Sequence, residues 1–273
     1  MSNVAISVEI HEHVAEVVLK GPGKGNALGP DFWRECPIVF AELDADPNVR
    51  AIILRGAGET FTFGLDLRAM MVDLGPLLAG GELLAASRTK LLAKVKELQK
   101  AADAIEQCHK PVIAAIAGWC IGGGVDIAAA CDIRLCTKDA KLSVREVKVA
   151  MVADLGSLQR LPRIIGQGMT RELAFTGDDV DGPHALRIGL VNHIYENEAE
   201  LLEGARSLAR RIAANPPLVV QGAKEVLNYC ADKSVADGQH FVAVWNSAFL
   251  ASKDLGEAMG AFAEKRAAKF TGE

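Results

Sequence analysis

The order of apolar and polar positions predicts a chain that begins with paired strands. Residues 4–10 and 14–19 alternate between apolar and polar side chains, which is typical of two neighbouring β-strands. Residues 49–55 and 112–117 are short, nearly continuous apolar runs, as expected for strands buried on both faces. Two further short strands are predicted at residues 132–137 and 142–144.

Helical spacing alternates with these strands and then dominates the second half of the chain. In residues 31–44, for example, Phe32, Cys36 and Val39 recur on one side of a helix. Helices are predicted at residues 31–44, 83–107, 125–130, 170–175, 182–188, 198–214, 217–230 and 239–268. Strand–helix alternation followed by a helical tail predicts an α/β core with a helical appendage.

Composition removes several classes of protein. Half of the 273 residues are hydrophobic, so the chain can bury a large core and general disorder is excluded. The net charge is −5 and no basic block occurs, which argues against nucleic acid as the main partner. The uncharged run at 112–125 is too short to span a membrane.

The termini and the cysteines predict a cytoplasmic protein. The first twenty residues carry Glu9, Glu12 and Glu16, which does not fit a targeting peptide. The six cysteines contain no C-x-x-C pair, so we expect reduced, buried thiols. His11 and His13 would share one face of a strand, but no third ligand is apparent, and we expect no metal site.

Two glycine-containing turns are candidates for ligand binding. Gly122, Gly123 and Gly124 stand between a predicted strand and a helix, where unpaired N–H groups can face an anion or an oxyanion. The alternative is a tight turn with close helix packing. A second turn, residues 61–67, follows another strand and could present one more N–H group, or could be an ordinary loop.

Three carboxylates are candidates for proton transfer. Asp126 and Asp154 have apolar neighbours on both sides, and acids in such places need a partner, a helix terminus or a function. Taken alone, Asp126 could simply be an N-terminal helix charge, and Glu146 could pair with a neighbouring cation.

The order of the motifs resembles the crotonase superfamily, also called the enoyl-CoA hydratase/isomerase family. The resemblance covers nearly the whole chain. It is carried by Gly-Asn-Ala-Leu at 25–28, Ile-Leu-Arg-Gly-Ala-Gly at 53–58, Phe-Gly-Leu-Asp-Leu at 63–67, the Lys-Pro-Val-Ile strand beginning at 110, Ile-Gly-Gly-Gly-Val-Asp at 121–126, Ala-Cys-Asp-Ile-Arg at 130–134, Gln-Arg-Leu-Pro at 159–162 and Ala-Phe-Ala-Glu-Lys-Arg at 261–266.

The resemblance implies a fold and a way of binding substrate. Such a chain is a spiral of ββα units (residues 1–200) holding the acyl-CoA site, followed by a helical region (residues 201–273) that packs homotrimers or hexamers. The thioester oxygen is bound by the backbone N–H groups of Leu65 and Gly123. The substrate-binding residues implied are Phe63, Gly64, Leu65, Asp66, Leu67 and Gly123. No metal or redox cofactor is implied, because the thioester itself acidifies the neighbouring C–H; coenzyme A is part of the substrate.

The trio Asp126, Glu146 and Asp154 is similar to that of the Δ3,5-Δ2,4-dienoyl-CoA isomerases of fatty-acid β-oxidation. Moving two conjugated double bonds one position toward the thioester removes a proton at C2 and returns one at C6. One carboxylate is poorly placed for both ends, so we expect Glu146 and Asp154 to divide the two proton transfers. Asp126 should stay ionised and raise the proton affinity of a neighbour.

Two alternatives remain open from the sequence. Asp126 and Glu146 alone could serve an enoyl-CoA hydratase, which adds water to a trans-2-enoyl-CoA. A non-catalytic acyl-CoA-binding oligomer is a second alternative, of another class; it is disfavoured by the presence of three acids and both oxyanion turns.

Overall fold

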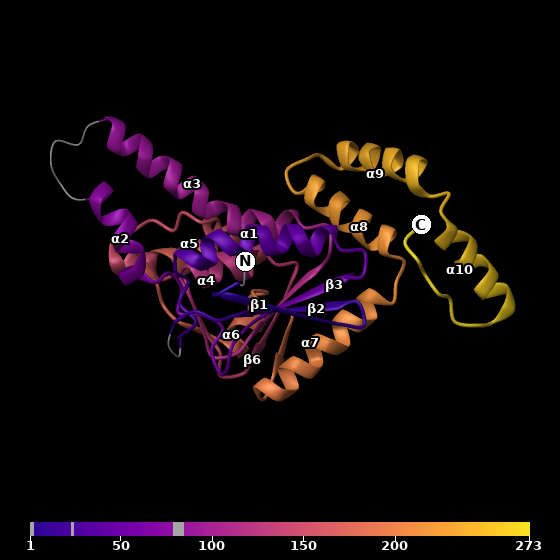
Figure 1. Cartoon of the computed structure of the whole chain (residues 1–273), viewed down its shortest axis with the longest axis horizontal. Coiled ribbons are helices and arrows are strands. Elements are labelled where there is room, and N and C mark those ends of the chain that lie inside the picture. Colours follow the sequence, from indigo (N-terminus) through magenta and orange to yellow (C-terminus); the bar gives the residue numbers. More distant parts are fainter. Residues whose placement is uncertain (1–2, 23–24, 79–84) are drawn as a thin grey trace.

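A six-stranded sheet lies at the centre of the molecule (Figure 1). The computed structural model describes residues 3–22, 25–78 and 85–273. The sheet has the order β1-β2-β3-β4-β6-β9. Its strands are β1 (Ile6–His11), β2 (Val14–Leu19), β3 (Ala51–Gly56), β4 (Val112–Ile116), β6 (Ile133–Thr137) and β9 (His193–Tyr195). Only β1 runs antiparallel to its neighbour, so the alternating N-terminal pattern is confirmed as a hairpin on a parallel sheet.

A smaller sheet and a first set of helices complete the core. The smaller sheet is made of β5 (Trp119–Ile121), β7 (Lys141–Ser143) and β8 (Val180–Asp181). The helices are α1 (Pro30–Ala45), α2 (Leu67–Leu78), α3 (Ala85–Gln107), α4 (Gly123–Ala130), α5 (Ser157–Thr176) and α6 (Gly182–Arg187). The order β1-β2-α1 returns as β4-β5-α4 and β6-β7-α5, which confirms the predicted α/β class built from ββα units.

Several elements differ from the sequence prediction. Helix α2 and strand β5 were not predicted, and α5 begins at Ser157 rather than near residue 170. Helix α5 contains Pro162 and is kinked at Gly166, where φ is 78° and ψ is 162°, and these two residues hide its helical pattern. Residues 83–84, the start of the helix predicted at 83–107, lie outside the described residues.

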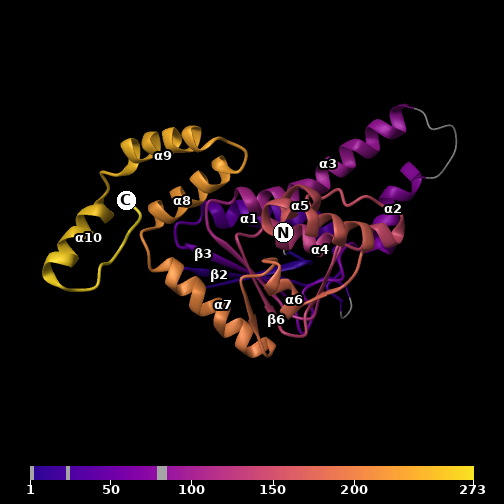
Figure 2. The same cartoon turned by 180° about the vertical axis from the view of Figure 1, so that it is seen from behind.

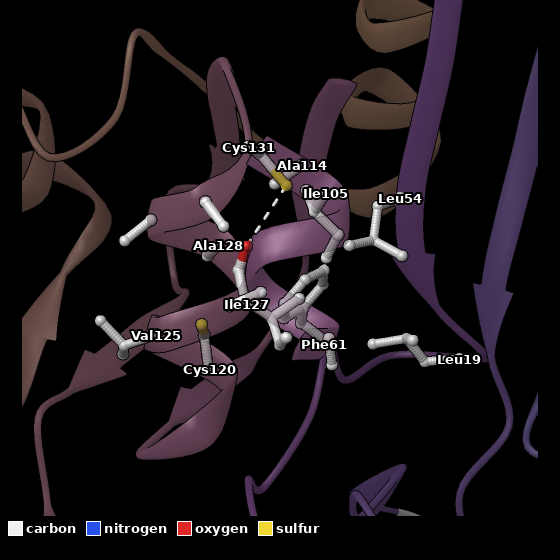
Figure 3. Packing of buried hydrophobic residues seen from close by; sticks show 14 of the residues in the cluster. Leu19, Leu54, Phe61, Ile105, Ala114, Cys120, Val125, Ile127, Ala128 and Cys131 are labelled. Carbon is white, nitrogen blue, oxygen red and sulfur yellow. Dashed lines mark hydrogen bonds between the residues drawn. The ribbon is translucent and has the colours of Figure 1, made fainter. Parts of the chain in front are cut away.

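The main core brings together residues of the large sheet and of the helices α1, α3 and α4. Phe61 is fully buried and packs among apolar side chains from several elements (Figure 3), including Leu54 of β3, Ile105 of α3 and Ile127 of α4. Burying a side chain of this size stabilises the fold by roughly 1.5–3 kcal/mol. The core therefore holds the sheet and the helix that carries Asp126 in one fixed arrangement.

Five of the six cysteines belong to this interior. All six are free thiols, and only Cys230 is not fully buried. Burial raises the pKa of each of the buried thiols, which are Cys36, Cys108, Cys120, Cys131 and Cys136. Cys131 donates a long hydrogen bond to the carbonyl oxygen of Ile127 (3.4 Å, Figure 3), so it behaves as a packing residue.

The opposite face of the sheet is covered by α7 (Glu198–Ala213). Its residues Leu201, Ala205, Ala209 and Ala213 repeat at every fourth position and are buried against the strands. This spacing places them on one helix face. Although α7 falls in the predicted C-terminal region 201–273, it packs as part of the core; the division at residue 200 itself stays a prediction.

The first of the last three helices stays bonded to the body through Lys224, whose Nζ lies 2.7 Å from Asp132 Oδ2, and the other two reach away from it (Figures 1 and 2). The three helices are α8 (Pro217–Cys230), α9 (Val235–Phe249) and α10 (Lys253–Glu264). The prediction of a single helix at 239–268 is wrong, because α9 ends at Phe249 and a new helix begins at Lys253. The Ser252 side chain caps α10 by accepting from the N–H of Leu255. Large apolar side chains stay exposed on this arm, among them Val235, Leu250 and Phe262.

Candidate active site

The first predicted oxyanion turn is held by main-chain contacts on both sides. Gly64 has φ +80°, and its carbonyl oxygen accepts from the N–H of Leu28 (2.8 Å). A Cβ at Gly64 would lie 2.3 Å from the carbonyl oxygen of Ile121, so only glycine fits here. Among the described residues, no acceptor is recorded for the N–H of the next residue, Leu65.

The second turn lies directly against the first. Gly122 has φ +52° and donates to the carbonyl oxygen of Ser143 (2.9 Å), which fixes the start of α4. Gly123 is the first residue of that helix, so its N–H has no acceptor within the helix. The Gly123 nitrogen would lie only 3.3 Å from a Cβ at Gly64. The two turns that carry the N–H groups of Leu65 and Gly123, called the amide turns below, are therefore in contact.

Asn26, which the sequence analysis assigned no role, braces the first turn. Its side-chain amide donates to the carbonyl oxygens of Ala57 (2.9 Å) and Thr60 (2.7 Å). Its own carbonyl oxygen accepts from the Thr62 hydroxyl (2.7 Å), and that hydroxyl accepts from the N–H of Gly64 (3.0 Å). Since Asn26 is buried, these bonds stiffen the backbone that carries Leu65.

Asp126 is the most deeply buried of the three acids, with 1% of its surface exposed. It stands in the first turn of α4, and Oδ1 accepts from the backbone N–H of Ser157 (2.5 Å) at the start of α5. Oδ2 has no partner within the described part of the chain. Burial raises the pKa of Asp126 to about 6, the charge of Asp154 acts in the same direction, and the hydrogen bonds from Ser157 oppose the rise.

Glu146 begins a short 3₁₀ helix, Glu146–Val149, directly after β7. Its Oε1 would lie 3.1 Å from a Cβ at Gly122, so the carboxyl faces the second amide turn. Oε2 is buried and finds no partner among the described residues. Burial raises the pKa of Glu146 to about 7, and the charges of Asp126 and Asp154 add to the rise.

Asp154 lies between this 3₁₀ helix and α5 along the chain and is more exposed than the other two acids. The residue as a whole is exposed, yet partial burial of its carboxyl still raises its pKa. Its charge acts on both Asp126 and Glu146, so the structure brings the three predicted acids into one electrostatically coupled group. The titrations of the three acids are therefore linked.

The burial of Asp126 predicts a measurable cost in stability. Because its pKa is raised on folding, the folded chain holds this proton more tightly, and the free energy of unfolding falls as pH rises from about 4 to 6. Asp126→Asn should therefore raise the free energy of unfolding at pH 8 by about 1–3 kcal/mol, and by much less at pH 4. Urea unfolding at both pH values measures this. The exposed Asp139→Asn is the matched control, and an equal change in both variants would contradict the prediction.

The remaining predicted binding residues flank the two turns. The Phe63 ring is half exposed and meets the Trp119 ring edge to face, with centroids 6.4 Å apart. Asp66 accepts from the N–H of Ala69 (3.0 Å), so its side chain supports the start of α2. Leu67 opens that helix and is about half exposed. Contact of these residues with a substrate stays a prediction.

The described part of the chain holds neither a cluster of potential metal ligands nor a helix that could span a membrane. Among the described residues, no group of three or more His, Cys, Asp or Glu side chains is placed to hold a metal ion. None of the described helices is both long enough and apolar enough to cross a membrane.

Comparison with known protein families identifies the family of this chain. Residues 9–273 match the family described as enoyl-CoA hydratase/isomerase. The chain belongs to this family. The resemblance and the fold class predicted from the sequence are thereby confirmed, and the two amide turns and three acids can be considered as features of an enoyl-CoA hydratase/isomerase family member.

Curated relatives refine the position of this family member. It is 45% identical over 255 residues to the mitochondrial Delta(3,5)-Delta(2,4)-dienoyl-CoA isomerase of Dictyostelium discoideum, covering 93% of this chain and 86% of the relative. It is 44% identical to the peroxisomal Delta(3,5)-Delta(2,4)-dienoyl-CoA isomerase of Arabidopsis thaliana, covering 94% and 92%. Because these relatives are named as organellar, the cytoplasmic location of this chain stays a prediction.

Solved structures support the fold of this family member. A putative enoyl-CoA hydratase from Streptomyces coelicolor A3(2) superimposes with a TM-score of 0.90 at 31% identity, covering 100% of this chain and 96% of the other. An enoyl-CoA hydratase from Bacillus anthracis gives a TM-score of 0.89 at 30% identity, covering 99% and 100%.

Proposed function

We propose that this chain is an isomerase that converts 3,5-dienoyl-CoA to 2,4-dienoyl-CoA. The observation that carries the proposal is a third carboxylate beside the other two: Asp154 stands three residues before Ser157, whose N–H holds Asp126, and its charge raises the pKa values of Asp126 and Glu146. Relatives at 44–45% identity that bear this activity in their names support it.

The proposed reaction needs two proton transfers and a stabilised enolate. One carboxylate of the pair Glu146 and Asp154 takes a proton from C2, and the C–H electron pair moves onto the adjacent thioester oxygen as an enolate conjugated with the diene; it returns through the diene when C6 is protonated. The N–H groups of Leu65 and Gly123 donate to that oxygen, and each is worth about 3 kcal/mol in the transition state. A proton from the other carboxylate is then added at C6, so atoms and charge balance without a redox partner or metal.

The raised pKa values suit such a proton relay. Glu146, with a pKa near 7, exchanges its proton close to neutral pH, where a general acid or base is most effective. Asp126 touches neither transferred proton in this scheme. Its buried negative charge instead helps keep the pKa of Glu146 raised.

The two alternatives receive no specific support. A hydratase would use Asp126 and Glu146 to hold one water, and Asp154 would then have no task. A non-catalytic acyl-CoA-binding oligomer would have no need for three coupled acids beside two amide turns.

The proposal includes a homotrimer or hexamer as the working state and a cytoplasmic location. The exposed apolar side chains of α8–α10, such as Phe262 at 86% exposed, support burial of this arm against other copies of the chain. The substrate is an acyl-CoA thioester, no separate cofactor takes part, and fatty-acid β-oxidation is the proposed pathway.

Supplying 3,5-dienoyl-CoA and trans-2-enoyl-CoA separately tests the function. The unmodified chain should form the 2,4-diene, seen as rising conjugated-diene absorbance, and should leave the enoyl chromophore largely intact. Asp154→Asn should lower kcat for isomerisation by about 10²-fold or more, because one of two proton transfers loses its acid or base. Full-rate isomerisation by Asp154→Asn would remove Asp154 from the mechanism. Rapid hydration of trans-2-enoyl-CoA by the unmodified chain would favour the hydratase. Binding of the thioesters without turnover would favour the non-catalytic acyl-CoA-binding oligomer.

A further inference from the structure

One polar face of α3 contacts the segment that connects Asp154 to α5. Gln99, Asp103 and Glu106 are spaced by four and three residues, so they lie on the same side of the helix. This side is opposed by residues 154–160. In the sequence, these three residues resemble ordinary solvated positions of a long helix.

The first contact fixes the main chain at Asp154. The side-chain amide of Gln99 donates to the carbonyl oxygen of Asp154 (2.7 Å). Because the bond is made to the backbone, it sets where the Cα of Asp154 lies and leaves the carboxyl free to face the other acids.

The second contact fixes the start of α5. Arg160 donates through Nη2 to Asp103 Oδ1 (3.0 Å) and to Glu106 Oε2 (2.6 Å), and only 10% of its side chain is exposed. Its guanidinium lies against Gly156, where a Cβ would be 1.8 Å from Nη1. Gly156 has φ +123°, so glycine both forms this turn and leaves room for the arginine.

The two contacts bracket Ser157, whose N–H holds Asp126. A shift of the segment would therefore move the Asp154 carboxyl and the hydrogen bond to Asp126 together. Proton transfer is sensitive to such movement, since a misplacement of about 1 Å can cost about 10²-fold in rate.

We propose that Gln99, Asp103 and Glu106 of α3, together with Arg160, form a clamp that positions two of the three carboxylates of the site. These are positioning residues, because none of them lies among the reacting groups. The inference rests on the proposed isomerase function and deepens it. It assigns the geometry of the acid group to a helix face outside the site.

Arg160 also acts on Asp126 through its charge. Among the described residues, the charged and titratable groups that interact electrostatically with Asp126 include Glu146, Asp154, Arg160 and the Cys120 thiol. Arg160 is the one cation among them, and it lowers the pKa of Asp126. Removing that cation should raise the apparent pKa of the acid group and move the acidic limb of the rate profile to higher pH.

Two variants separate position from charge. Gln99→Met removes the contact to Asp154 without changing any charge, and should lower kcat for 3,5-dienoyl-CoA by about tenfold with KM changed less than about twofold. Arg160→Met should lower kcat similarly and should also move the acidic side of the pH–rate profile to higher pH. Arg160→Lys keeps the positive charge, so it should return the pH–rate profile to that of the unmodified chain and recover part of kcat. Lys100→Met, an exposed change on the same helix, is the control and should leave both values unchanged.

Thermal unfolding of each variant accompanies the kinetics, so that a loss of folded protein is not read as a loss of positioning. If the unmodified chain turns over the dienoyl thioester but Gln99→Met and Arg160→Met keep its kcat and pH profile, the clamp is overturned and the isomerase function stands. If KM rises while kcat is kept, the clamp is likewise overturned. If the unmodified chain shows no isomerisation, the proposed function fails, and the clamp with it.

Discussion

Glu146→Gln is expected to lower kcat for the isomerisation of 3,5-dienoyl-CoA by about 10³-fold, the size of effect seen when a general acid or base is removed. The carboxyl faces the Gly122 turn, its Oε2 is buried, and glutamine keeps its shape while removing its proton chemistry. KM should change little, because the thioester is bound by main-chain amides in the proposed scheme. Steady-state kinetics that follow diene absorbance measure both values.

The exposed Glu42→Gln on α1 is the matched control and should retain full activity. In the unmodified chain, kcat/KM should change near pH 7: it falls as pH drops through about 7 if Glu146 is the base at C2, and falls as pH rises through about 7 if Glu146 is the acid at C6. Activity of Glu146→Gln within tenfold of the unmodified chain would exclude Glu146 as one of the two proton-transfer groups.

Gly64→Ala is expected to lower kcat by about 10²–10³-fold, as loss of an oxyanion donor does. Its Cβ would lie 2.3 Å from the carbonyl oxygen of Ile121, which belongs to the neighbouring amide turn. Relief of this clash must push the two turns apart, so the N–H groups of Leu65 and Gly123 could no longer reach one oxygen together. Kinetics with the dienoyl thioester and thermal unfolding test this.

Gly58→Ala separates this clash from backbone strain. Gly58 also has a positive φ, +66°, but a Cβ there meets nothing within 4 Å. In both variants, an alanine in the left-handed region lowers the free energy of unfolding by about 1–2 kcal/mol. Only Gly64→Ala should lose turnover. Equal kcat in the two variants would contradict a catalytic role for the contact between the turns.

Periodicity predicted most of the core elements because each buries a regular face. The apolar runs of β3 and β4 and the spacing of α1 are direct consequences of burial, and the structure confirms them. Helix α2 was missed because Gly75 and Pro76 interrupt its pattern, and β5 because three residues between glycine turns carry no period. The break between α9 and α10 had a readable signal in Ser252, which caps the second helix.

The site was predictable only where chemistry is concentrated in sequence. The glycine turns and the three acids stand out because glycines and carboxylates in apolar surroundings are unusual. Their supports do not: Asn26 reaches residues more than thirty positions away, and Gln99 and Arg160 make contacts more than fifty positions apart. Such contacts exist only after folding, and single-sequence patterns contain no trace of them.

The burial of five cysteines affects how the protein would be oxidised during storage in solution. Peroxide and alkylating agents attack the thiolate, and burial both hides these sulfur atoms and disfavours that form. Oxidative damage to the interior would therefore follow transient opening of the core and would not precede it. Reductant in a storage buffer would then protect partly opened molecules, while the intact fold keeps these five thiols away from the oxidant.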